Sequence, residues 1–94
     1  MSEAEWHDDK AQKNKKKHKG LSFEAAQEVF GDPYAVEIFD ETHSTLDELR
    51  FKVLGRIRNQ TVIVVVYTQR SDKIRIISAR YASVKERQAY YDSF

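Results

Sequence analysis

The sequence contains no cysteine, only one proline and three glycines, and no long run of apolar residues. Without cysteine the chain can form neither a disulfide framework nor a thiolate metal site, which fits a cytosolic protein. No apolar run approaches the ~18 residues that span a bilayer, so no transmembrane helix is expected. The N-terminus also lacks the basic and apolar regions of a signal peptide. We therefore expect a cytoplasmic protein that does not bind membranes.

Charges of one sign are missing from long segments of the chain, although the formal net charge is only +1. Residues 10–19 contain six lysines and no acid, and residues 21–49 contain eight acids and no Lys or Arg. Residues 50–87 contain ten Lys or Arg and only two acids. Such segregation can present a basic face to a polyanion. The alternative is that these blocks neutralise one another across the fold, and charge alone does not separate the two.

Residues 61–80 form a strongly β-forming segment. Residues 62–67 are an almost unbroken β-branched run, which is typical of a central strand buried on both faces. Residues 73–80 follow as a second strand after a short polar turn. Residues 35–39 and 51–58 predict two more strands, with an exposed acidic loop at residues 40–48 between them. Successive strands joined by short turns predict an antiparallel meander of about four strands.

Two helices are expected before this sheet. Asp8 or Asp9 can cap the first, which runs to about His18 and should lie on the surface because Ala11 is its only apolar residue. Ser22 caps the second helix. Its apolar residues recur at helical spacing, so we interpret them as core and not as a cofactor site.

A short helix is expected at the C-terminal end. Ser83 and Glu86 match a capping box, which predicts a helix that runs to about Asp92. Glu5 and Trp6 can start a short edge strand. The sequence therefore predicts a single α+β domain over residues 1–94, with two N-terminal helices, the meander sheet and the short C-terminal helix.

The residues that could carry chemistry are mostly cations. The three histidines lack metal-ligand spacing and the three glycines are too far apart for a phosphate loop, so neither a metal nor a cofactor is expected. Arg75 and Arg80 are five residues apart on one strand and should point to opposite faces unless a bulge intervenes. Arg87 and Tyr90 should lie on one side of the last helix.

Such residues suit metal-independent RNA cleavage, in which the 2′-hydroxyl attacks the phosphorus. Guanidinium groups can bind the phosphate and stabilise the phosphorane, and a histidine can carry protons. A tyrosine can stack on a base or hold a phosphate. The alternative for each arginine is a structural ion pair with the acidic segment 21–49 or with Glu86.

The order and spacing of several motifs resemble a known family. The carrying residues are Trp6, Asn14, Lys17, His18, LSFEAA at residues 21–26, VFGDP at 29–33, His43, Ser44, Arg50, Gly55, IRIISAR at 74–80, Glu86, Arg87 and Tyr90. Over nearly its whole length the chain resembles BrnT, the toxin family of a bacterial type II toxin–antitoxin pair.

The resemblance implies a RelE-like ribonuclease that arrests growth by cleaving RNA. It also implies neutralisation by a BrnA-type antitoxin, a ribbon-helix-helix DNA-binding protein, so that DNA is contacted only through the antitoxin. We expect a 2:2 complex formed through dimerisation of the antitoxin. The alternative function is a non-catalytic RNA- or protein-binding module, such as an inactive toxin homologue.

The expected site residues fall into two groups. His18, Arg75, Arg80 and Glu86 are the expected catalytic residues. Lys17, Arg50, Arg87 and Tyr90 are the expected RNA-binding residues. Arg75 and Arg80 would bind phosphate and stabilise transition-state charge. His18 is the first candidate for proton transfer and Glu86 the second, although capping also explains Glu86.

Overall fold

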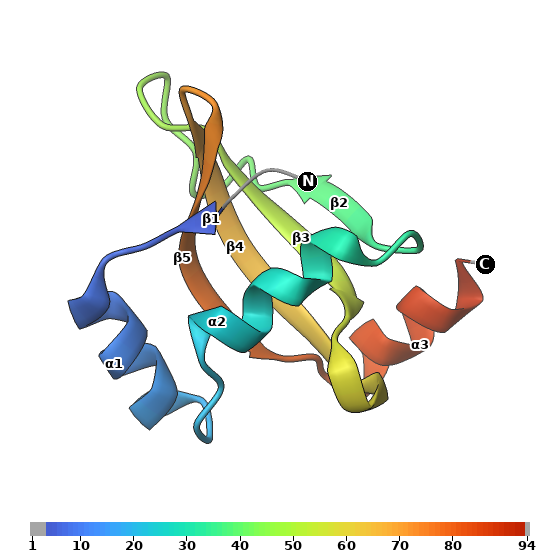
Figure 1. The fold of residues 1–94 in the computed structure, drawn as a ribbon. Coiled ribbons are helices and arrows are strands. Elements are labelled where there is room, and N and C mark those ends of the chain that lie inside the picture. The colour runs from blue at the N-terminus through green and yellow to red at the C-terminus, as the bar shows by residue number, and fades with distance from the viewer. Residues whose placement is uncertain (1–3, 94) are drawn as a thin grey trace.

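A five-stranded mixed sheet organises the molecule in a computed structural model that describes residues 4–93 (Figure 1). In chain order its elements are β1 (Ala4–Glu5), α1 (Asp8–Lys17), α2 (Phe23–Ala26), the 3₁₀ turn η1 (Gln27–Gly31), β2 (Val36–Phe39), β3 (Arg50–Arg56), the 3₁₀ turn η2 (Arg58–Gln60), β4 (Val62–Arg70), β5 (Lys73–Tyr81) and α3 (Val84–Asp92). The strand order across the sheet is β1-β5-β4-β3-β2. Helix α2 lies across one face, α1 beside the β5 edge and α3 near one end of the sheet.

The α+β architecture is confirmed, and the short edge strand expected at Glu5 and Trp6 is present as β1, but the sheet is a mixed one of five strands and not an antiparallel one of about four. Strands β2 to β5 form the antiparallel part of the sheet, and β1 adds a fifth strand that pairs parallel to β5. A two-residue strand has too little sequence to show a period of two, so its pairing could not be predicted.

The core lies on both faces of β4. Its residues 62–65 are at most 4% exposed, as expected for a central strand. Apolar side chains of α1, α2 and η1 cover one face together with those of the strands. A smaller cluster, which includes Tyr90 of α3, covers part of the other face. The rest of that second face is left open for polar side chains.

Two of the expected helix caps are present and one is not. The Ser22 hydroxyl accepts a hydrogen bond from the Ala25 amide at 3.0 Å, and Ser83 and Glu86 form the predicted capping box. The N-cap of α1 is His7, so Asp8 and Asp9 lie in the first turn instead, where they still complement the helix dipole. Within residues 4–93, no helix is long and apolar enough to cross a bilayer.

One polar side chain fixes α1 to the sheet. Asn14 is buried, and its Nδ2 donates to the Ala79 carbonyl at 2.8 Å while its Oδ1 accepts from the Ala79 amide at 3.1 Å. Nδ2 also lies 3.3 Å from the Leu21 carbonyl. The carboxamide therefore pairs with β5 as a peptide group of a neighbouring strand would, which explains how a helix with so little apolar surface is held.

A β-bulge in β5 changes which side chains share a face. Val66 pairs with Ser78 and Tyr67 with Ile76, so Ile77 is an extra residue. Ile76 and Ala79 both lie in the core beneath the helices. Alternation from these two residues places Arg75 and Arg80 on the opposite, open face. The expected separation of the two arginines is therefore wrong, because the bulge that could prevent it is present.

Candidate functional site

Arg80 and Glu86 form the best-defined polar pair of the open face. Arg80 ends near the start of α3, and the capping box places Glu86 in the first turn of that helix. Nη1 and Nη2 of Arg80 donate to Oε1 and Oε2 of Glu86 at 2.7 and 2.8 Å, a two-pronged contact between guanidinium and carboxylate. The Arg80 side chain is still 41% exposed, so its other N–H groups can reach a ligand.

This contact decides what Glu86 can do. The hydrogen bonds from Arg80 lower the pKa of Glu86 to about 2, although burial opposes the shift. A carboxylate with that pKa stays ionised near neutral pH and is a poor proton donor. Glu86 therefore anchors Arg80 and caps α3, which is the structural role that the capping box indicated.

A central hollow opens on the polar side of β3, β4 and β5. It has a volume of about 240 Å³. Its lining residues are Asp40, His43, Arg50, Lys52, Val64, Val66, Ile77, Ser78 and Arg80. Cations from two strands therefore face one small space, a composition that favours an anion such as a phosphate.

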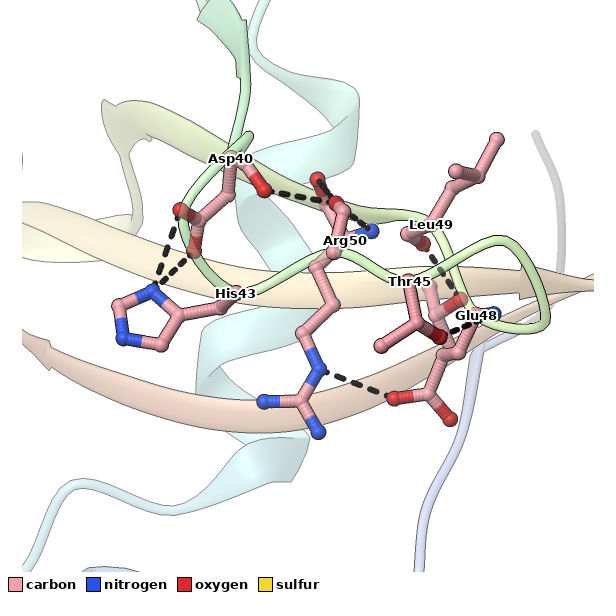
Figure 2. Close-up of polar contacts among 8 residues, drawn as sticks. Asp40, His43, Thr45, Glu48, Leu49 and Arg50 are labelled. Atoms are coloured by element: carbon pink, nitrogen blue, oxygen red, sulfur yellow. Dashed lines mark hydrogen bonds and ion pairs between the residues drawn. The ribbon is translucent and has the colours of Figure 1, made fainter.

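Asp40 and His43 of the loop after β2 line one side of the central hollow, and Figure 2 shows the polar contacts of this loop. The Ser44 hydroxyl donates to the Asp40 carbonyl at 2.6 Å and accepts from the Arg50 amide at 2.8 Å. Nδ1 of His43 lies 3.0 Å from the Asp40 carboxylate, and Nε of Arg50 donates to Glu48 at 2.9 Å. The loop thus fixes one histidine and one arginine at the hollow.

A second hollow, of about 480 Å³, lies between the end of α1 and the start of α3. Its lining residues are Lys17, His18, Lys19, Arg80, Tyr81 and Arg87. Burial, reinforced by the nearby charges of Lys17 and Arg80, lowers the pKa of His18 below its ordinary value. His18 is therefore neutral near pH 7 and able to accept a proton.

A third hollow, of about 270 Å³, runs along α1. It is lined by Lys10, Lys13, Asn14, Lys17, His18, Ile77 and Ser78. The three hollows adjoin, because Arg80 lines the first and second, and the third shares residues with both. We refer to them together as the basic groove.

The structure brings most of the expected site residues to the basic groove. Lys17, His18, Arg50, Arg80 and Arg87 line it directly, and Glu86 contacts it through Arg80.

Arg75 and Tyr90 lie elsewhere. Arg75 shares the open face but pairs with Glu5 of β1 at 2.9 Å, and its Nη1 lies 3.3 Å from Nε2 of His7. Tyr90 is fully buried, and its hydroxyl donates to Asp32 at 2.5 Å. A buried ring cannot stack on a base, so the expected RNA contact of Tyr90 is not supported by its position.

Sequence reasoning missed several residues of the groove. Lys52 lies two residues after Arg50 on β3, so the strand period was a usable signal for it. Lys10 and Lys13 share one side of α1 with Lys17, which helical spacing also indicates. His43 was among the motif residues that carry the family resemblance, but the sequence indicated no role for it, because its neighbours in the hollow come together only in the folded chain. No group of three or more His, Cys, Asp or Glu residues that could hold a metal is found in residues 4–93.

Comparison with known proteins identifies the family. A family model described as the ribonuclease toxin BrnT of type II toxin–antitoxin systems matches residues 6–86. The chain belongs to the BrnT family. The family assignment confirms the resemblance inferred from the sequence motifs, and it implies an antitoxin partner. No curated protein matches the chain.

A solved BrnT structure supports the same fold. The chain is similar to the crystal structure of the Brucella abortus ribonuclease toxin BrnT, with a TM-score of 0.66 and 22% sequence identity. The match covers 88% of this chain and 99% of that one. At this identity the likeness concerns the fold, a three-helix, five-strand α+β arrangement.

Proposed function

We propose that this BrnT-family chain is a metal-independent endoribonuclease that arrests bacterial growth by cleaving RNA in the cytoplasm. The basic groove is the observation that carries the proposal, because it gathers cations around an oriented arginine and two histidines. The family description supports ribonuclease activity. The open cationic face of the α+β sheet supports a RelE-like enzyme.

In the proposed reaction the scissile phosphate lies against Arg80. Glu86 holds the guanidinium in one orientation, so little reorganisation is needed when charge develops on the phosphorane oxygens. Arg50 and Lys52 bind the same phosphate or its neighbour from β3. His18 is neutral and takes the proton of the attacking 2′-hydroxyl. Lys17 and Arg87 contact the flanking RNA.

We propose that a BrnA-type antitoxin neutralises this activity in a 2:2 complex. The support is membership of a type II toxin–antitoxin family, whose toxins are paired with protein antitoxins. DNA would be contacted only through the antitoxin's ribbon-helix-helix domain. Analytical ultracentrifugation of the co-expressed pair would give the stoichiometry.

Induced expression in a bacterial host tests the proposal. The parent should arrest growth and leave cleaved RNA, and co-expression of the antitoxin should relieve the arrest. Arg80→Ala should abolish it, because losing an oriented transition-state donor costs about 10²–10³-fold in rate. Arg58→Ala is the matched control, since Arg58 is an exposed arginine paired with Glu28 outside the groove. Folded parent protein without nuclease activity, or an Arg80→Ala variant as toxic as the parent, would contradict the proposal.

A non-catalytic RNA- or protein-binding module is the second candidate. The observation in its favour is that Arg50, Arg75 and Arg80 each already pair with a carboxylate, namely Glu48, Glu5 and Glu86. This candidate predicts RNA or partner binding that weakens steeply with salt and yields no cleaved product. Product analysis of the same RNA incubations separates the two functions.

A further inference from the structure

We propose that His43, positioned by Asp40, is the general acid that protonates the leaving 5′-oxygen during RNA cleavage. The inference deepens the proposed ribonuclease function and rests on it. It adds a second proton carrier to His18. His18 would accept the proton of the 2′-hydroxyl, and His43 would protonate the leaving 5′-oxygen.

The Asp40 carboxylate fixes both the tautomer and the direction of the ring. Oδ2 and Oδ1 of Asp40 lie 3.0 and 3.2 Å from Nδ1 of His43. An ionised carboxylate only accepts hydrogen bonds, so Nδ1 must carry a proton and Nε2 is the atom left to serve the hollow. Asp40 is 7% exposed whereas His43 is 61% exposed. The carboxylate is thus shielded and the imidazole is reachable by RNA.

The proposed step uses the ring as an imidazolium. In that form both ring nitrogens carry protons, and Nδ1–H stays on the Asp40 carboxylate. In that state Nε2–H is a donor directed at a ligand in the hollow. Carboxylate–imidazole pairs of this kind orient a catalytic histidine and stabilise its positive charge.

The loop does not need the His43 ring for its own shape. Its backbone is held by the Ser44 hydroxyl between Asp40 and Arg50. The Thr45 hydroxyl accepts from the Glu48 amide at 3.0 Å, and the Thr68 hydroxyl donates to the Leu49 carbonyl at 2.7 Å. The loop therefore positions His43 but does not depend on the His43 ring for its own structure, which is expected of a functional side chain.

Each of the two histidines lines a different hollow together with Arg80. His43 lines the central hollow with Arg50, Lys52 and Arg80, and His18 lines the neighbouring hollow with Arg80. A phosphate bound at Arg80 would therefore have an acid on one side and a base on the other, as in-line displacement at phosphorus requires. The environments of the two histidines suit a base and an acid, respectively. His18 is held neutral among cations, and His43 lies against an anion.

The reaction balances without another reactant. The 2′-oxygen forms a bond to phosphorus as its proton passes to His18. The bond from phosphorus to the 5′-oxygen breaks, its electron pair stays on that oxygen, and the oxygen takes the proton from Nε2 of His43. The products are a 2′,3′-cyclic phosphate and a 5′-hydroxyl, and both histidines regain their starting states by exchange with water.

A sulfur-substituted RNA tests this assignment. After the parent's cleavage site is mapped, an oligoribonucleotide is made with sulfur in place of the 5′-bridging oxygen at that site. A thiolate leaves without protonation, so the loss of a general acid matters only for the oxygen substrate. His43→Ala should cleave the oxygen RNA about 10²–10³-fold more slowly than the parent and the sulfur RNA at nearly the parent rate. Asp40→Asn should show a smaller loss on oxygen with the same rescue by sulfur.

Controls separate the possible causes of a loss. His18→Ala and Arg80→Ala should be impaired on both RNAs, and Thr42→Ala, an exposed neighbour outside the hollow, should match the parent on both. His43→Gln provides a second variant if the alanine form does not fold. Equal cleavage of the oxygen RNA by the His43 variants and the parent would overturn the inference, as would equal impairment on both RNAs. A parent that cleaves neither RNA would overturn the proposed function as well.

Discussion

The Glu86 side chain links the start of α3 to the cationic face of the sheet. Its carboxylate accepts from the Ser83 amide at 2.8 Å and from both terminal nitrogens of Arg80. The same group therefore stabilises a helix N-terminus and sets the direction of a guanidinium. A sequence can show the first of these roles through the capping box, but the second depends on where β5 ends relative to α3.

Replacing this carboxylate should cost stability in a pH-dependent way. Glu86→Gln should lower the free energy of unfolding by about 1–2 kcal/mol at pH 7, through the weakened cap and the lost ion pair. The pKa of Glu86 is lowered from 4.5 to about 2, so its contribution is complete above pH 4.5 and is lost as the pH falls towards 2. Urea unfolding of both proteins across this range should show the difference shrinking. A constant difference would contradict the assignment.

Tyr90 shows why residue types alone misassign a role. Tyr90 and Tyr91 are adjacent on a helix that has no clear apolar stripe, and the sequence does not show which ring turns inward. The structure buries Tyr90 and leaves Tyr91 41% exposed. Arg80, Arg87, His18 and Lys17, which were expected as site residues, line one hollow. Arg75 was expected with them but is held at the β1 edge by Glu5.

The hydroxyl of Tyr90 should contribute stability that disappears at high pH. Burial and the hydrogen bond to Asp32 raise the pKa of Tyr90 from 10.0 to about 12, so the contribution is complete below pH 10.0 and is lost as the pH rises towards 12. Tyr90→Phe should lower the free energy of unfolding by about 1 kcal/mol at pH 7, because Asp32 keeps its bonds from backbone amides. Thermal unfolding measures this, and Tyr81→Phe, a half-exposed tyrosine, should cost much less. Equal losses would show that the buried hydrogen bond is not the cause.

At the scale of elements, α1 depends on one polar side chain more than on apolar contact. Asn14→Ala would leave the buried amide and carbonyl of Ala79 without their partner, which should cost about 2–3 kcal/mol. Compared with the parent, the variant should show amide hydrogen exchange that is accelerated more in residues 8–17 than in β4. Gln12→Ala, at an exposed position of the same helix, is the matched control and should change neither quantity. Unchanged exchange in the Asn14→Ala protein would mean that α1 is held by other contacts.

The regular elements were predictable and the irregular ones were not. Periodicity and caps located the helices and the four longer strands to within a few residues. The bulge at Ile77 could not be predicted, because Ile76 and Ile77 are adjacent and either of them could face the core in a regular strand. The placement of Arg75 and Arg80 on one face followed from that single inserted residue.

At the scale of the whole molecule, charge segregation produces both of the arrangements left open by the sequence. Part of the basic content is neutralised locally, as in the ion pair between Arg58 and Glu28. The lysines of α1 and the cations of β3 instead gather in the basic groove. Composition predicts a basic face, but only the fold shows where the cations gather.

The salt dependence of RNA binding should therefore increase with the number of lysines in the basic groove that contact phosphates. For a non-cleavable RNA with a 2′-deoxy sugar at the cleaved position, the slope of log K against log salt should be about −0.7 per phosphate neutralised. Replacing Lys13 and Lys17 by alanine should make the slope shallower by about 1.4. Replacing Lys73 and Lys85, which are exposed outside the groove, should leave it nearly unchanged. Filter binding over a salt series decides between these outcomes.

The contact between Asn14 and Ala79 also limits how molecules of this protein can associate. An open sheet exposes unpaired peptide groups at its two edges, and each can accept a strand from another chain. Along β5 the short β1 strand occupies part of one edge, and the Asn14 carboxamide occupies the peptide group of Ala79 further along. Strand β2 forms the other edge, and three of its four residues are exposed. Uncontrolled strand addition, and the aggregation that follows from it, is therefore expected at β2 more than along this part of β5, where β1 and a single amide side chain already occupy peptide groups.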